Sequence, residues 1–277
     1  MAGNPRDGAL ARYLRNYVVS PRYATRPLSL RTADGVDLAA YLVPGPPDAT
    51  TTIVLVHGFA NWSRNPRIHA FATRLARGAY VLVPDLRGHG RSRGRCTLGR
   101  DEPLDVAAAV AAAPTDTVVT LGVSLGAAAV LVHAATSEVA GVVAVSAPAW
   151  WEAGGGHGAQ RVGTWVGSPA RRRLLAHAVR TRVADDCAGR INPIEAVARI
   201  AAPTLFVHDP DDHYFDGSHA TALYERAIPP KDLWWRPGQG HGTDLLTPEL
   251  ADLILRGPWP SSSPAPVRPW GTGSPAP

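Results

Sequence analysis

The chain is poor in cysteine, since Cys96 and Cys187 are the only two among its 277 residues. Two thiols cannot form a framework of several disulfides, nor a zinc site built from cysteines alone. So low a cysteine content is typical of proteins in a reducing compartment, and we expect a cytoplasmic protein.

Long apolar runs and charged residues are also scarce. No segment reaches the roughly 18 apolar residues that a membrane-spanning helix requires, and residues 1–19 lack the apolar stretch of a signal peptide. Only 18% of the residues are charged and 45% are hydrophobic, which favours a soluble globular protein with a full core. The net charge of +5 comes almost entirely from arginine, and no basic run is interleaved with stacking aromatic residues. We therefore expect neither a membrane nor a nucleic acid as a partner.

What is present is an alternation of strand-like and helix-like segments. Residues 28–44 alternate in hydrophobicity around Asp34 and Gly35, a pair that favours a hairpin turn. Short apolar runs follow, typical of strands buried on both faces of a parallel sheet: TTIVLVHG, YVLVPD, TVVTLG, GVVAVSAP, PTLFVHD and LWWRP. Helix-like segments separate most of them, at 66–77, 104–113, 125–135 and 217–227. This order predicts an α/β protein whose mostly parallel sheet carries helices on both faces.

One interval, 150–192, contains no strand-like run. It holds a glycine cluster and an arginine-rich helical stretch, with seven arginines against three acidic residues. We interpret 150–192 as an insertion over the edge of the sheet, and 1–149 together with 193–257 as the core. The Pro-, Ser- and Gly-rich residues 258–277 are predicted to form a disordered tail.

A serine between two glycines is the first candidate for chemistry. Ser124 lies in GVSLG, which fits the G-x-S-x-G pattern and stands between a strand-like and a helix-like run. A sharp turn there would lift the hydroxyl above the carboxyl ends of the strands, where open α/β sheets bind ligands. A helix-capping serine is the simpler alternative, but the context on both sides favours a nucleophile.

A serine nucleophile needs a base to remove its proton and backbone donors to stabilise the oxyanion. Of the ten histidines, His241 stands in the glycine-rich stretch GQGHG after the last strand-like run, and we predict that it is the base. The oxyanion donors would be the backbone N–H of Leu125, directly after the serine, and that of Phe59, after the VLVHG run. We interpret four other histidines, at strand ends, in a loop or on a predicted helix, as structural: His57, His89, His133 and His208.

The acid that would orient this base is left open by the residues alone. The stretch HDPDDHYF offers Asp209, Asp211 and Asp212 just after a strand-like run, and Glu152 is a further candidate. The same stretch suggests a rival metal site, because His208, Asp209, Asp211 and His213 are possible ligands. Neighbouring side chains at a strand end diverge, however, and no second cluster completes such a site.

Taken together, these motifs resemble those of the α/β-hydrolase superfamily. The similarity covers about 28–257 and includes VLVHGF, VPDLRGHGRS, GVSLG, PTLFVHDPDDHYF and GQGHG. The resemblance implies the α/β-hydrolase fold, a Ser-Asp-His triad with Asp212 as its acid, and a cap at 150–192. Asp209 stands where the family's usual acid loop has glycine, so Asp211 stays a possible substitute.

A serine in the nucleophile position favours acyl transfer. We expect a hydrolase that cleaves a carboxylic ester of a small to medium substrate through an acyl-enzyme, with no metal or organic cofactor. Thioester hydrolysis is the first alternative, and short-peptide hydrolysis or a non-catalytic small-molecule receptor on the same fold are less favoured. Four tryptophans could line an apolar acyl pocket or simply pack within the fold: Trp62, Trp150, Trp151 and Trp165.

Overall fold

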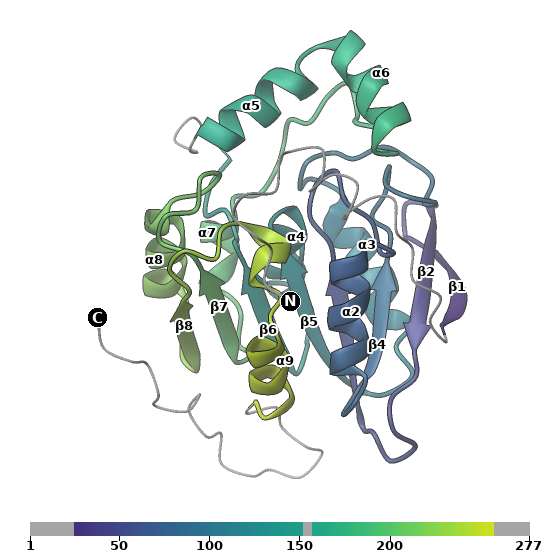
Figure 1. Cartoon of the computed structure of the whole chain (residues 1–277), viewed down its shortest axis with the longest axis vertical. Coiled ribbons are helices and arrows are strands. Elements are labelled where there is room, and N and C mark those ends of the chain that lie inside the picture. Colours follow the sequence, from purple (N-terminus) through teal and green to yellow (C-terminus); the bar gives the residue numbers. More distant parts are fainter. Residues whose placement is uncertain (1–24, 152–156, 258–277) are drawn as a thin grey trace.

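A single sheet forms the centre of the protein in the computed structural model, which describes residues 25–151 and 157–257. Within these residues the sheet has eight strands in the order β1-β2-β4-β3-β5-β6-β7-β8 (Figure 1). The first two strands form an antiparallel hairpin, β2 pairs antiparallel with β4, and all the other pairs are parallel. The strands are β1 (Arg26–Arg31), β2 (Asp37–Val43), β3 (Thr51–Val56), β4 (Tyr80–Pro84), β5 (Thr117–Val123), β6 (Gly141–Val145), β7 (Thr204–His208) and β8 (Lys231–Trp235).

The central strands are buried along almost their whole length because both of their faces are covered. Every residue of β6 and β7 is buried, and in β3 and β5 only the first residue is partly exposed. Alternate side chains of a strand point to opposite faces, so these runs feed two hydrophobic clusters, one on each side of the sheet.

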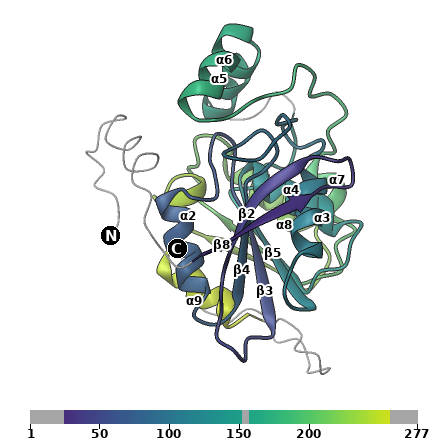
Figure 2. The same ribbon diagram turned by 90° about the vertical axis from the view of Figure 1, so that its right-hand side faces the viewer.

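The helices form two layers, one on each face of the sheet (Figure 2). One layer contains α2 (Pro66–Leu75) and α9 (Pro248–Leu255), which pack against each other. The other contains α3 (Glu102–Ala111), α4 (Leu125–Ala134), α7 (Pro193–Val197) and α8 (Gly217–Arg226). This is the α/β-hydrolase fold that the motifs predicted.

The described part of 150–192, the interval predicted to be an insertion, contains two helices that stand apart from both layers. These are α5 (His157–Val166) and α6 (Pro169–Ala178), and Figure 1 shows them beyond the carboxyl ends of the central strands. The chain returns along the loop that follows β4, because the Arg182 N–H donates to Gly88 O at 2.7 Å and the Cys96 N–H donates to Arg182 O at 2.7 Å. The predicted tail at 258–277 and Glu152 lie outside the described residues.

Candidate active site

Ser124 occupies a strained turn between β5 and α4. Its φ of 54° and ψ of −114° lie outside the regions that L-residues favour. The N–H of Ser124 donates to Val145 O at 2.8 Å, so the turn is fastened to the neighbouring strand β6. Its side chain makes no capping bond to α4. The hydroxyl is therefore presented at the carboxyl edge of the sheet instead of closing the helix N-terminus.

Two glycines allow other segments to approach this turn closely. A Cβ on Gly126 would lie 2.5 Å from Val56 O, which explains why α4 can pack directly against the end of β3. A Cβ on Gly58 would lie 3.2 Å from the Ser124 Cβ, so the loop after β3 runs beside the candidate nucleophile. A side chain at either position would push the turn away from its neighbours.

His241 and Asp212 converge on Ser124 from the ends of β8 and β7, which lie on the same side of β5 in the sheet. The His241 Nε2 lies 3.0 Å from Ser124 Oγ, and the His241 Nδ1 lies 2.6 Å from Asp212 Oδ2. Asp212 follows β7 and His241 follows β8, while Ser124 follows β5. All three strands are parallel, so their carboxyl ends share one edge of the sheet.

The carboxylate of Asp212 is buried and well supplied with donors. Its Oδ1 accepts the backbone N–H of Tyr214 at 2.8 Å and that of Phe215 at 3.3 Å. Burial alone would raise its pKa, but the hydrogen bond and charge of His241, with the Tyr214 N–H, lower the pKa below the usual value of an aspartate. Asp212 is thus held as an anion facing the imidazole.

The other acids considered from the sequence do not take this place among the described residues. The side chain of Asp211 is exposed, and its N–H donates to Asp209 Oδ1 at 3.0 Å. His208, the first of the suggested metal ligands, bonds to Phe215 O at 2.7 Å. Within 25–151 and 157–257, no group of three or more His, Cys, Asp or Glu side chains could hold a metal ion.

His57 and His89 hold the loop that follows β3. His57 bonds through Nδ1 to Gly58 O at 2.8 Å and accepts the Leu86 N–H at Nε2. His89 lies beside it, with ring centroids 5.1 Å apart, and its Nε2 accepts the Ala60 N–H at 3.3 Å. Burial, with the nearby His57, lowers the pKa of His89 to about 3, so this imidazole is neutral at physiological pH.

The residues predicted to supply the oxyanion donors both lie near the Ser124 turn. Leu125 is the first residue of α4, where a backbone N–H has no partner within the helix. Phe59 lies in the loop whose Gly58 touches the Ser124 turn, and its ring packs edge-on against His89 with centroids 5.9 Å apart. Their role as oxyanion donors stays a prediction.

The four predicted pocket tryptophans are spread over the structure. Trp62 is half-buried in the loop between β3 and α2. Trp150 stacks on His219 with centroids 4.3 Å apart, and Trp151 donates its Nε1–H to Ile191 O at 2.9 Å. Trp165 on α5 is 38% exposed and lies beneath the Arg171 guanidinium. These contacts suit packing and anchoring, and a role in a substrate pocket stays a prediction.

Sequence reasoning missed two aromatic side chains beside His241. The Tyr214 ring lies 4.4 Å from the imidazole centroid and the Phe215 ring lies 5.8 Å from it. Tyr214 and Phe215 stand two and three positions after Asp212 in HDPDDHYF, so their place in the same loop was the available signal.

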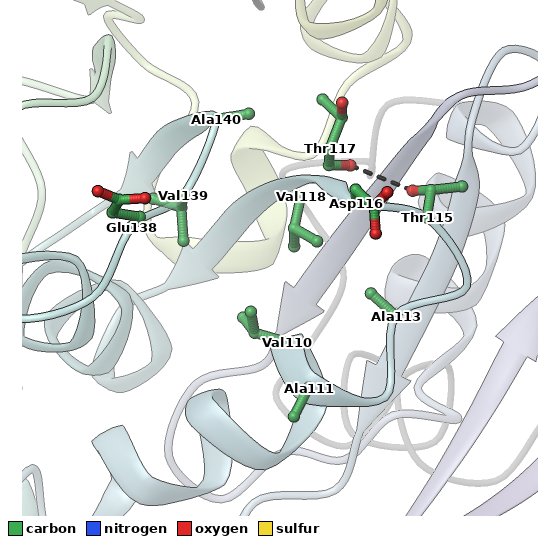
Figure 3. Close-up of a pocket in the computed structure, with 10 residues that line it drawn as sticks. All are labelled: Val110, Ala111, Ala113, Thr115, Asp116, Thr117, Val118, Glu138, Val139 and Ala140. Carbon is green, nitrogen blue, oxygen red and sulfur yellow. Dashed lines mark hydrogen bonds between the residues drawn. The ribbon is translucent and has the colours of Figure 1, made fainter. Parts of the chain in front are cut away.

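A hollow of about 560 Å³ opens at the opposite end of the sheet (Figure 3). It lies where α3 ends and where β5 and β6 begin, and Thr115, Asp116 and Glu138 are among its lining residues. Ser124 follows the far end of β5, and a strand of seven residues spans about 20 Å. The hollow is therefore too distant to serve the Ser124 site.

Comparisons with curated proteins and with solved structures find relatives of this chain and structures that share its fold. Human alpha/beta hydrolase domain-containing protein 17B is 26% identical over 76% of this chain and 67% of its own length. The Caenorhabditis elegans protein aho-3 is 40% identical over 55 residues, only 17% of its length. Among solved structures, the Pyrococcus furiosus esterase Pf2001 is 21% identical over 86% of this chain and 93% of its own, with a TM-score of 0.68. The Rhodococcus esterase RhEst1 is 23% identical over 82% and 96%, with a TM-score of 0.68.

None of the helices in the described part of the chain combines the length and apolarity needed to cross a bilayer.

The two esterases share the fold of this chain at low sequence identity. The match to a family model is more direct, since residues 53–256 fit the model described as the alpha/beta hydrolase family. The chain therefore belongs to the alpha/beta hydrolase family.

Proposed function

We propose that the protein is a serine hydrolase that cleaves a carboxylic ester through an acyl-enzyme. The observation that carries this proposal is the continuous chain of contacts from Asp212 through His241 to Ser124, with separations of 2.6 and 3.0 Å. Both distances are within hydrogen-bond reach for a nucleophile, a base and an orienting acid.

In the proposed reaction, Ser124 Oγ attacks the ester carbonyl carbon while His241 Nε2 takes the hydroxyl proton. The C–O bond to the alcohol then breaks, and His241 returns the proton to the leaving alkoxide. Water, deprotonated in turn by His241, attacks the acyl-enzyme and releases the acid with a free Ser124. Asp212 fixes the tautomer of His241 and stabilises its cationic form, and the backbone N–H groups of Leu125 and Phe59 would bind the oxyanion.

An ester is favoured over an amide because an alkoxide leaves more readily than an amine. The neighbouring solved structures named as esterases are consistent with this choice, although their low identity supports only the fold. A thioester would use the same groups in the same steps and is the nearest alternative substrate.

The test is a panel of p-nitrophenyl esters of graded acyl length, run beside acyl thioesters and short peptide amides. We expect saturable ester hydrolysis that is lost in Ser124→Ala. Thioester turnover far above ester turnover would move the assignment to a thioesterase. No turnover of any class, combined with tight binding of a small molecule, would favour a receptor.

A further inference from the structure

We propose that Asp209 and Ser146 are positioning residues that clamp His241 by holding the peptide N–H on either side of it. The Gly240 N–H donates to Asp209 Oδ2 at 2.5 Å. The Gly242 N–H donates to Ser146 Oγ at 3.0 Å. The inference rests on the proposed function, because it assigns a role to residues around the proposed base.

The loop that carries His241 needs such a restraint. Gly240 has a φ of 92° and Gly242 a φ of 64°, so the histidine stands between two residues in conformations that side chains disfavour. Neither glycine has a side chain to pack against the sheet. The two peptide hydrogen bonds therefore hold the backbone on both sides of His241, while Asp212 binds the imidazole itself.

Asp209 is suited to this task because one carboxylate joins the two loops. The residue is only 2% exposed. Its Oδ2 holds the His241 loop through Gly240, while its Oδ1 accepts the Asp211 N–H, next to Asp212. The Asp209 carboxylate thus fixes the distance between the loop that carries Asp212 and the loop that carries His241.

Ser146 is equally well fixed. It follows β6, is fully buried, and has a φ of 50°, a strained value for a residue other than glycine. Its N–H donates to Val207 O at 2.9 Å, which anchors its backbone to β7. Since β6 lies between β5 and β7 in the sheet, its end faces the gap between Ser124 and Asp212. The Ser146 hydroxyl therefore binds the Gly242 N–H, on the C-terminal side of His241, from the same carboxyl edge of the sheet.

The experiment compares Ser146→Ala, Asp209→Ala and Asp209→Asn with a matched control, Thr52→Val. Thr52 is also fully buried, and its hydroxyl bonds to Thr115 Oγ1 at 2.7 Å, but it lies at the amino end of β3. The kinetic readout is the split between kcat and KM on a p-nitrophenyl ester. A second readout is the downfield proton NMR signal of His241 Nδ1–H shared with Asp212, which needs no turnover.

For Ser146→Ala and Asp209→Ala we expect kcat to fall on the order of 10- to 100-fold, with KM changed less than about twofold, because misplacing a base slows chemistry more than binding. Asp209→Asn keeps one acceptor oxygen for the Gly240 N–H, so it should recover most of the loss. The NMR signal should broaden in both alanine variants and persist in Thr52→Val, which should retain its kcat.

Wild-type kcat in folded Ser146→Ala and Asp209→Ala, with an unchanged NMR signal, would overturn the clamp. A lower melting temperature with unchanged kcat would also overturn it, since that is a structural role only. If the wild-type protein hydrolyses no ester, the proposed function fails, and the NMR comparison alone still decides the clamp: broadening in Ser146→Ala supports it and an unchanged signal refutes it.

Discussion

The ring of Tyr214 packs against the imidazole of His241, with centroids 4.4 Å apart and planes tilted by 40°. The backbone of the same residue donates to Asp212 Oδ1 at 2.8 Å. Tyr214 thus touches both partners of the proposed base-acid pair. An aromatic face attracts a cation, so the ring should stabilise His241 when it carries the proton of the transition state.

Removal of this ring should slow turnover without affecting the nucleophile itself. We expect Tyr214→Leu to lower kcat/KM by roughly fivefold, which corresponds to about 1 kcal/mol of cation–π stabilisation. Tyr214→Phe keeps the aromatic face and should stay close to wild type. Steady-state ester kinetics of both variants provide the comparison, and an equal loss in the two would assign the effect to the phenol hydroxyl instead.

Neutralising the proposed acid should have a much larger effect. Asp212→Asn retains an oxygen for the Tyr214 N–H, so the loop should keep its shape, but the amide cannot hold His241 in the required tautomer and charge state. We expect kcat to fall by about 10³–10⁴-fold. The circular dichroism spectrum should stay unchanged. Near-normal turnover would transfer the acid role to Asp211 or Glu152.

A methyl group at Gly58 should disturb the site from the side of the β3 loop. Its Cβ would lie 3.1 Å from Val123 O and 3.2 Å from the Ser124 Cβ, which is tighter than about nine in ten real Cβ contacts. The loop or the serine turn must shift by a few tenths of an ångström. We expect Gly58→Ala to lower kcat about tenfold with a smaller change in KM, as measured by ester kinetics. Unaltered kcat would mean that this loop does not contribute to the reaction.

Acid should destabilise the fold through its buried histidines. The folded-state pKa of His89 is about 3, whereas an unfolded histidine titrates near its ordinary value of 6.5. The unfolded chain therefore binds more protons below pH 6.5, and this part of the stability, complete above 6.5, is lost as the pH falls toward 3. For this one group the slope is about 1.4 kcal/mol per pH unit.

Urea denaturation between pH 7.5 and 4.5 measures this loss. His89→Gln removes the titrating ring, so its free energy of unfolding should vary less steeply with pH than that of the wild type. Parallel pH profiles in the two proteins would show that His89 binds its proton equally well in the folded and unfolded chains.

The architecture was readable from the sequence because its signals are local. Runs rich in apolar and β-branched residues, such as 51–56 and 141–145, become strands buried on both faces, and the helix-like segments between such runs become helices. Boundaries that depend on distant contacts were less accurate. The helix expected from residue 104 begins at Glu102, because the buried carboxylate of Glu102 accepts the N–H groups of Thr97 and Gly99.

The site was readable only in part. Ser124 and His241 stand out through their glycine-rich motifs, and the separation of 3.0 Å agrees with their pairing. The choice among three aspartates depends on how one turn directs its side chains, and the residues alone could not decide it. The contacts of Tyr214, Asp209 and Ser146 with the histidine segment depend on the packing of loops from different strands, which no local pattern encodes.

The most direct test of the account is covalent labelling with a fluorophosphonate probe, followed by mass spectrometry of the digested protein. The proposed mechanism predicts one phosphonylated peptide, modified at Ser124, which is absent from Ser124→Ala and forms far more slowly in His241→Ala. A folded protein that stays unlabelled, or that is labelled at another residue, would contradict the proposal that His241 activates Ser124.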